Sequence, residues 1–114
     1  MRPDLDSLAD PTRRTLLALL AVEQELCVCE LEAALDLIQP VVSRQLAILR
    51  EAGWLEASRE GRRIYYRIGD VPRWARLLVD AYLAGGVPPA DLETARQRLN
   101  AFAGRPIRLT RAAS

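Results

Sequence analysis

The chain has 114 residues, half of them apolar, and a formal net charge of +1. This length favours one compact domain rather than two. No apolar run approaches the roughly 20 residues that span a bilayer, and the first residues lack the basic and then apolar pattern of an export signal. We therefore expect a cytoplasmic protein with no membrane partner.

The small net charge conceals two oppositely charged halves. Residues 1–57 contain 5 arginines and 10 acidic residues, whereas residues 58–114 contain 11 arginines and 5 acidic residues. Every basic residue is arginine, whose planar guanidinium suits phosphate and guanine. GC-rich codon usage would explain the missing lysine equally well. The choice of arginine therefore does not by itself indicate nucleic-acid binding, and only the positions of the arginines along the chain can do so.

Three helices are predicted in the first half. The first begins at Asp10-Pro11, because aspartate caps free amides and proline fits a first helical turn. The second covers about residues 26–35. The third covers about residues 39–52, with Pro40 in its first turn and Gly53 as its C-terminal stop. Three short helices in succession predict a trihelical core.

A hairpin and further helices follow in the second half. Residues 54–58 and 63–68 are strand-like, and the four residues between them include Gly61, which a tight turn needs. One helix is predicted after Asp70 and a last one after Pro88-Pro89. The expected fold is a mainly α (α+β) winged helix-turn-helix, with about five to six helices and a two-stranded β-hairpin wing. Residues 1–104 would form this domain, and residues 105–114 a flexible basic tail.

The third helix and the hairpin have the features of a DNA-reading pair. In a helix-turn-helix the second helix of the pair lies in the major groove and needs one apolar face and one short polar face. Arginine reads guanine and glutamine reads adenine, while arginines of a wing meet phosphates or the minor groove. A solvated surface helix would look similar, but the arginine-rich hairpin beside it favours DNA. The candidate residues are Gln39, Val41, Ser43, Arg44 and Gln45 on the helix and Arg59, Arg62 and Arg63 on the hairpin.

Five segments, in this order and at this spacing, resemble the ArsR family of metalloregulatory repressors over about residues 5–85. The cysteine-containing segment is similar to the arsenic-sensing branch in particular. The segments are Leu8-Ala9-Asp10-Pro11-Thr12-Arg13, Glu25-Leu26-Cys27-Val28-Cys29-Glu30-Leu31, Gln39-Pro40-Val41-Val42-Ser43-Arg44-Gln45-Leu46, Leu49-Arg50-Glu51-Ala52-Gly53 and Glu60-Gly61-Arg62-Arg63-Ile64-Tyr65-Tyr66-Arg67-Ile68.

The resemblance implies a homodimeric repressor that binds an inverted-repeat operator and is released by trivalent arsenic or antimony. Terminal helices would form the dimer, and the leucine-rich first segment and the apolar stripe of residues 71–82 fit that role. The stripe could instead pack within its own chain. Two residues depart from the family pattern: Gln45 stands where relatives often have histidine, and Ile38 where a capping serine or threonine is expected.

Cys27 and Cys29 are the candidate inducer ligands, because thiolates bind arsenic and antimony. On a regular helix these positions are about 200° apart, so either they lie at an irregular helix start or the ion unwinds the first turn. Arsenic-sensing relatives have a third cysteine where this chain has Glu32, which predicts two protein thiolates plus solvent or a small thiol. Cysteine is also a common small core residue.

Other classes of ligand and function fit less well. The chain has no histidine, so a zinc site of histidines and carboxylates cannot be built. Thiol oxidation is an alternative trigger for a winged-helix repressor, and a module that binds only protein is another possibility. A dithiol oxidoreductase would use Cys27 and Cys29, but the usual Cys-x-x-Cys near a βαβ pattern is missing. We therefore expect no enzyme.

Overall fold

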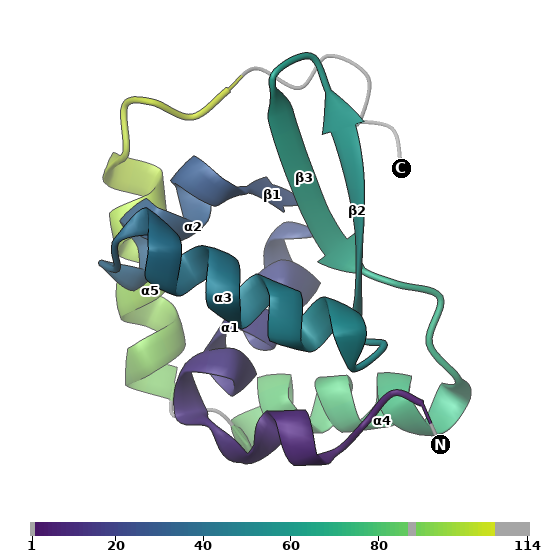
Figure 1. Ribbon diagram of the computed structural model, residues 1–114. Coiled ribbons are helices and arrows are strands. Elements are labelled where there is room, and N and C mark those ends of the chain that lie inside the picture. The colour runs from purple at the N-terminus through teal and green to yellow at the C-terminus, as the bar shows by residue number, and fades with distance from the viewer. Residues whose placement is uncertain (1, 87–88, 107–114) are drawn as a thin grey trace.

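In the computed structural model, which describes residues 2–86 and 89–106, α-helices pack beside a small antiparallel sheet (Figure 1). The elements are η1 (Asp6–Ala9), α1 (Pro11–Glu23), β1 (Leu26–Cys27), α2 (Val28–Leu35), α3 (Gln39–Glu51), β2 (Leu55–Glu60), β3 (Arg63–Ile68), α4 (Arg73–Ala81), η2 (Tyr82–Gly86) and α5 (Pro89–Ala101). This is the expected winged helix-turn-helix. No helix in the described ranges is long and apolar enough to cross a membrane.

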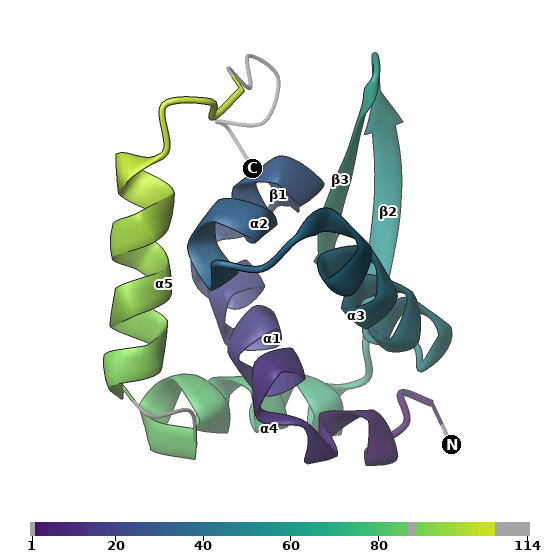
Figure 2. The same cartoon turned by 60° about the vertical axis from the view of Figure 1, so that its left-hand side comes forward.

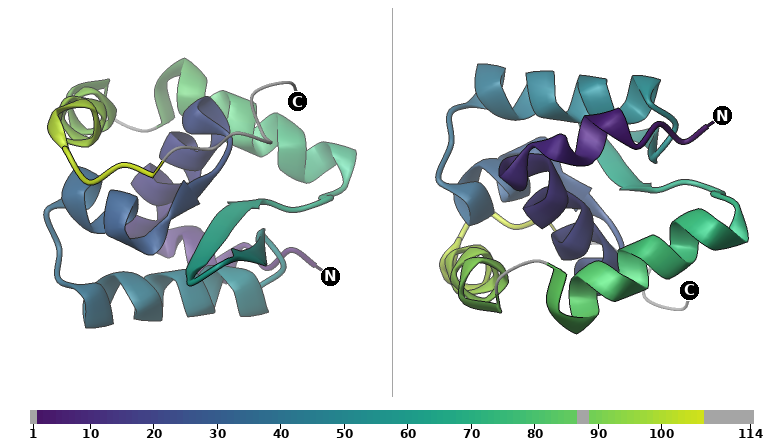
Figure 3. Two further views of the ribbon diagram at one scale, coloured as in Figure 1. Left: turned by 90° about the horizontal axis from the view of Figure 1, so that it is seen from above. Right: turned by 90° about the horizontal axis from the view of Figure 1, so that it is seen from below.

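Helix α1 is the centre of the core. It begins as predicted, with Pro11 in its first turn and the Asp10 carboxylate accepting a hydrogen bond from the backbone amide of Arg13 (3.1 Å). Seen from below, α1 lies between α3 and α4 (Figure 3). Its leucines, Leu16, Leu17, Leu19 and Leu20, are at most 1% exposed. The expectation that this leucine-rich segment supplies a dimer surface is therefore wrong, because these side chains fill the core of their own chain.

Helix α3 forms where the sequence predicts it. Val42, Leu46 and Leu49 are fully buried, and Gly53 ends the helix with φ +95°, a conformation that glycine adopts without strain. Ile38 occupies the N-cap without a side-chain hydrogen bond, and its side chain is 68% exposed. The helix start thus lacks the cap that serine or threonine would provide.

The predicted hairpin is confirmed, and a third strand joins it. Strands β2 and β3 pair antiparallel from Leu55↔Ile68 to Glu60↔Arg63, so the turn is the pair Gly61-Arg62. Gly61 has φ +64°, which favours glycine. Strand β1 pairs with the other edge of β3, which gives the order β1-β3-β2. The sequence did not predict β1, because a two-residue strand is defined only by its distant partner.

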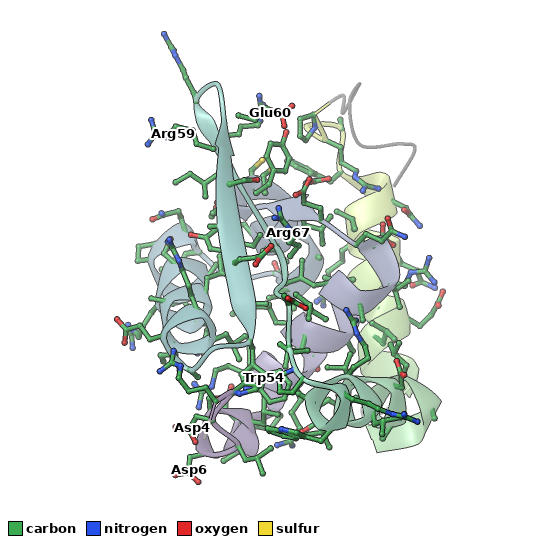
Figure 4. All side chains as sticks on the ribbon, turned by 90° about the vertical axis from the view of Figure 1, so that its right-hand side faces the viewer. Asp4, Asp6, Trp54, Arg59, Glu60 and Arg67 are labelled. Carbon is green, nitrogen blue, oxygen red and sulfur yellow. The ribbon has the colours of Figure 1, made fainter. Side chains whose placement is uncertain are left out.

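The N-terminal segment is hydrogen-bonded to the C-terminal end of α3. The Asp4 amide donates to the Ala52 carbonyl (2.8 Å), and the Trp54 indole donates to the Asp4 carbonyl (2.9 Å). Figure 4 shows Asp4 beside Trp54. Trp54 is fully buried and meets Trp74 of α4 edge to face, with ring centroids 6.2 Å apart. The end of α3, the base of the wing and α4 are thereby joined.

Helices α4 and α5 complete the core from outside. Helix α5 covers α1 and α2 (Figure 2). In α4, Ala75 and Val79 are fully buried, and Trp74 and Leu78 pack half-buried against the core. Most of the stripe in residues 71–82 therefore packs within its own chain, the alternative that the sequence left open.

Candidate nucleic-acid interface and thiol pair

The predicted reading face of α3 lies at the surface. Gln39 and Arg44 are exposed, and Val41, Ser43 and Gln45 are half-buried at the flanks of this face. The wing rises beside the helix (Figures 1 and 2). The five predicted residues thus occupy the N-terminal half of one helix that is held from behind by the core.

Two of the polar side chains on this face are already oriented by neighbours. The Gln39 amide nitrogen donates to the Ser43 hydroxyl (2.8 Å), one helical turn away. The Gln45 amide oxygen accepts from Arg13 of α1 (2.9 Å). The face therefore presents partly fixed hydrogen-bonding groups rather than freely rotating side chains.

The wing carries exposed cations at its tip. Arg59, Arg62 and Arg63 are all exposed, and Figure 4 shows Arg59 projecting from the wing on the side where α3 lies. Arg67, farther along β3, pairs with Glu56 and with Glu25. The Arg67 charge is therefore paired within the sheet, whereas the three predicted tip arginines are exposed at the end of the wing.

The two cysteines meet at the junction of β1 and α2. Cys27 ends β1 in an extended conformation (φ −87°, ψ 169°), and the helix begins only at Val28. The sulfur atoms of Cys27 and Cys29 are 2.9 Å apart; Cys27 is 1% exposed and Cys29 is half-buried. Of the two arrangements that the spacing allowed, the structure has the irregular helix start, and no unwinding is needed to bring the sulfurs together.

A buried carboxylate holds this junction. Glu30 is 0% exposed; one of its oxygens accepts from the Cys27 backbone amide (3.0 Å) and the other from Arg105 (2.8 Å). Arg105 also lies 3.6 Å from Glu23. Sequence reasoning identified neither Glu30 nor Arg105, although a glutamate three residues after an N-cap is a capping-box signal. Residues 107–114 of the predicted tail lie outside the described residues.

The pair is chemically suited to a thiophilic ion. With metal–sulfur bonds of about 2.3 Å, sulfurs that share an ion lie roughly 3–4 Å apart, so the 2.9 Å contact has to widen only slightly. In the described part of the chain no third cysteine, aspartate or glutamate joins them to form a three-ligand cluster. The junction thus brings two cysteine sulfurs together, and any further position on an ion would be left to a ligand from solution.

The chain is similar to known bacterial regulatory proteins. The family "Bacterial regulatory protein, arsR family" matches residues 10–57. The arsenic resistance transcriptional regulator ArsR1 of Pseudomonas putida is 54% identical over 81 residues, covering 70% of this chain and 60% of ArsR1. ArsR2 of the same organism is 40% identical over 108 residues, covering 93% of this chain and 92% of ArsR2.

A solved structure extends the likeness to the fold. The antimony-specific transcriptional repressor AntR superposes with a TM-score of 0.58 at 36% identity, covering 82% of this chain and 77% of AntR. These relatives are transcriptional regulators and not enzymes, which confirms the expectation from the sequence. The chain belongs to the ArsR family of bacterial regulatory proteins.

Proposed function

We propose that the chain is a DNA-binding transcriptional repressor that leaves its operator when trivalent arsenic or antimony binds Cys27 and Cys29. The observation that carries the proposal is the contact of the two sulfurs, 2.9 Å apart, where β1, the strand that pairs with the wing, meets α2. The printed names of the relatives, regulators of arsenic resistance and a repressor specific for antimony, support the same ligand chemistry.

Helix α3 and the wing would divide the work of binding DNA. The exposed N-terminal half of α3 enters the major groove, where Gln39, Val41, Ser43, Arg44 and Gln45 meet base edges or phosphates. Arg59, Arg62 and Arg63 of the wing bind neighbouring phosphates or the minor groove. The core behind α3 supports this role because it fixes the helix as a rigid body.

Ligand binding would act on both DNA-contacting elements. Cys27 belongs to β1, which pairs with Tyr65 and Tyr66 in the returning strand of the wing, and Cys29 lies in the first turn of α2, which packs on α3. Spreading the two sulfurs around one ion would shift β1 against β3 and α2 against α3. A conformer that binds the ion better than the DNA-competent one then gains population.

Two copies would bind one inverted repeat, one half-site each. The exposed Leu77 (55%) of α4 and Leu83 (38%) of η2 supply apolar surface for this homodimer. The place of action would be the cytoplasm, where thiols stay reduced.

The first test begins by selecting bound duplexes from a random DNA library with the purified full-length chain. Arsenite titrated into the selected complex should release the wild-type protein. The double variant C27S/C29S should bind the same duplex with unchanged affinity and stay bound, because hydroxyls do not replace thiolates as ligands for a soft ion. Fluorescence anisotropy of labelled duplex measures both quantities.

In this test the metalloid trigger and the sequence-specific DNA binding can each fail separately. Release of the double variant at the arsenite concentration that frees wild type would show that the trigger is wrong. Selection of no common sequence by the wild-type chain would show that it is not a sequence-specific DNA binder. Titration with zinc serves as the control ligand and should leave the complex intact.

Oxidation of the thiol pair is a second candidate trigger, favoured by the same sulfur contact. A two-electron oxidant such as hydrogen peroxide would join the sulfurs with loss of two hydrogen atoms. In that case peroxide would release the wild-type complex, a thiol reductant would restore it, and C27S/C29S would respond to neither. Failure of peroxide to release a complex that arsenite releases would exclude this trigger.

A further inference from the structure

Three exposed residues form one line along the outward side of α3. Val42 is fully buried and faces the core. Because successive residues of a helix are about 100° apart, Pro40, Arg44 and Ala47 lie within about 40° of the direction opposite to Val42. All three are exposed. We call Pro40, Arg44 and Ala47 the outward line of α3.

The outward line combines one cation with two apolar side chains. Arg44 ends in a guanidinium, which donates hydrogen bonds, whereas the Pro40 ring and the Ala47 methyl group consist of carbon alone. The polar side chains that flank the line already contact other side chains of the protein. The part of α3 that projects farthest from the core is therefore largely apolar.

The surroundings of the outward line favour DNA as the surface that covers it. The wing lies beside α3 (Figure 2), and its exposed arginines Arg59, Arg62 and Arg63 surround the approach with positive charge, to which Arg44 adds. The major groove complements such a surface, because its rims are phosphates and its floor presents both hydrogen-bonding groups and methyl groups. We therefore take the floor of the major groove as the partner of Pro40 and Ala47.

An apolar side chain finds one favourable partner on that floor. All four bases present hydrogen-bonding groups in the major groove, but only thymine presents an apolar group, its 5-methyl. If Pro40 or Ala47 covered a donor or an acceptor instead, that group would lose its water without gaining a partner, which costs binding free energy. Contact with a thymine methyl removes apolar surface of both partners from water.

The spacing along the helix sets where these thymines lie. Pro40 is four residues before Arg44 and Ala47 is three residues after it, which correspond to about 6 Å and 4.5 Å along the helix axis. Successive bases of one strand are about 3.4 Å apart. A helix that lies along the groove thus places the two thymines within about two base pairs of the base that Arg44 contacts, one on each side.

We propose that Pro40 and Ala47 are specificity-determining residues that read the 5-methyl groups of two thymines, one on each side of the base contacted by Arg44. This inference rests on the proposed function, since it requires that α3 reads DNA. It adds two base-contacting residues whose side chains have neither a donor nor an acceptor, which is why a search for hydrogen-bonding side chains passes over them.

The first test needs only the wild-type full-length chain and a duplex that it selects from a random library. Each thymine of the duplex is replaced in turn by uracil, which lacks only the methyl group, and affinity is measured by fluorescence anisotropy. Two thymines should each be sensitive, with a loss of about four-fold, the effect of one buried methyl group. A selected duplex without any sensitive thymine would overturn the inference. Failure to select any motif would instead overturn the proposed function.

Variants assign each sensitive thymine to its residue. P40S should bind the thymine and uracil duplexes equally well at one of the two positions, and A47S should do so at the other, because the apolar partner of the methyl has been lost. Pro11 provides the matched control, since it is also an exposed proline in the first turn of a helix, α1. P11S should keep the wild-type sensitivity at both positions. Wild-type sensitivity in both P40S and A47S would contradict the assignment.

A methyl group on a different base separates contact with the methyl from contact with the rest of thymine. At each sensitive position the thymine–adenine pair is replaced by cytosine–guanine, with or without a methyl at C5 of the cytosine. Wild type should bind the 5-methylcytosine duplex about four-fold more tightly than the cytosine duplex, and the variant matched to that position should bind both equally. Equal binding of the two duplexes by wild type would show that the methyl is not what α3 reads.

Discussion

Glu30 shows how a single residue can tie the thiol pair to the rest of the molecule. Its carboxylate is fully buried, yet both oxygens have partners: the Cys27 backbone amide and the Arg105 guanidinium. A buried charge is tolerated when it is paired and hydrogen-bonded in this way. The start of α2 therefore depends on a residue that lies 75 positions away in the sequence.

Removing the partner of Glu30 should be costly for stability. R105A removes the charged partner of a fully buried carboxylate, and we expect the free energy of unfolding to fall by roughly 3 kcal/mol. The measurement is urea denaturation followed by circular dichroism.

Arg96 offers the control for that variant. It pairs with Glu23 at 3.2 Å, but its side chain is 42% exposed, and pairs of this kind contribute about 1 kcal/mol or less. R96A should therefore change the stability much less than R105A does. Equal losses in the two variants would mean that Glu30 does not depend on Arg105.

At the scale of elements, the wing joins an exposed cationic tip to β1, the strand that ends in Cys27. Its tip residues Arg59, Arg62 and Arg63 are exposed, while Arg67 at its base is occupied by glutamates. Contacts to phosphates release counterions and are read out as salt dependence. The tip and the base of the wing therefore have separable roles.

Replacing two tip arginines should weaken DNA binding without changing its specificity. For R62A/R63A we expect the slope of log affinity against log salt to become shallower by about 1 per lost phosphate contact. Affinity for selected and unrelated duplexes should fall together. Anisotropy titrations over a salt series measure both, and R76A, an exposed arginine on α4 at the end of the molecule opposite the wing, should leave the slope unchanged.

The elements differ in how far the sequence could predict them. Helix α3 and the hairpin carry their own signals: Pro40, the buried spacing of Val42, Leu46 and Leu49, and a glycine after the helix and in the turn. Strand β1 has no such signal, because its two residues become a strand only by pairing with Tyr65 and Tyr66. The contact between the cysteine sulfurs was hidden for the same reason, since it depends on Cys27 lying outside the helix.

Contacts between residues that lie far apart in the sequence could not be predicted from sequence patterns either. The sequence indicated that Gln45 lies on the reading face, but the Arg13 contact joins positions 32 residues apart. The resemblance to the ArsR family suggested a dimer role for the leucine-rich first segment, and a helix that is apolar over most of its circumference does not itself reveal which face meets which neighbour. Burial in the folded chain decided that question.

At the scale of the whole molecule, apolar surface remains at the end opposite the wing tip. The N-terminal segment and α4 both lie there (Figure 1), and Leu5 and Leu77 are each 55% exposed. Exposed apolar side chains of this size suit an interface between protein chains. Dimerisation through this end would leave α3 and the wing of each copy free for DNA.

A charge at this surface should separate the proposed dimer. For L77E we expect the mass in solution to fall from twice the chain mass of 12.7 kDa to that of a single chain, because a carboxylate would be buried there without a partner. Sedimentation velocity measures the change. The control R44E also alters charge at an exposed position, but on α3 outside the proposed interface, and should remain dimeric; a wild-type monomer would contradict the homodimer.

The pairing of Trp54 with Trp74 gives the molecule an optical reporter. These are the two tryptophans of the chain, and their rings meet edge to face at the point where the reading helix ends, the wing begins and α4 passes. All tryptophan fluorescence of the chain therefore arises where α3, the wing and α4 meet. Light from that spot can follow the movement of helix and wing in solution without any attached dye.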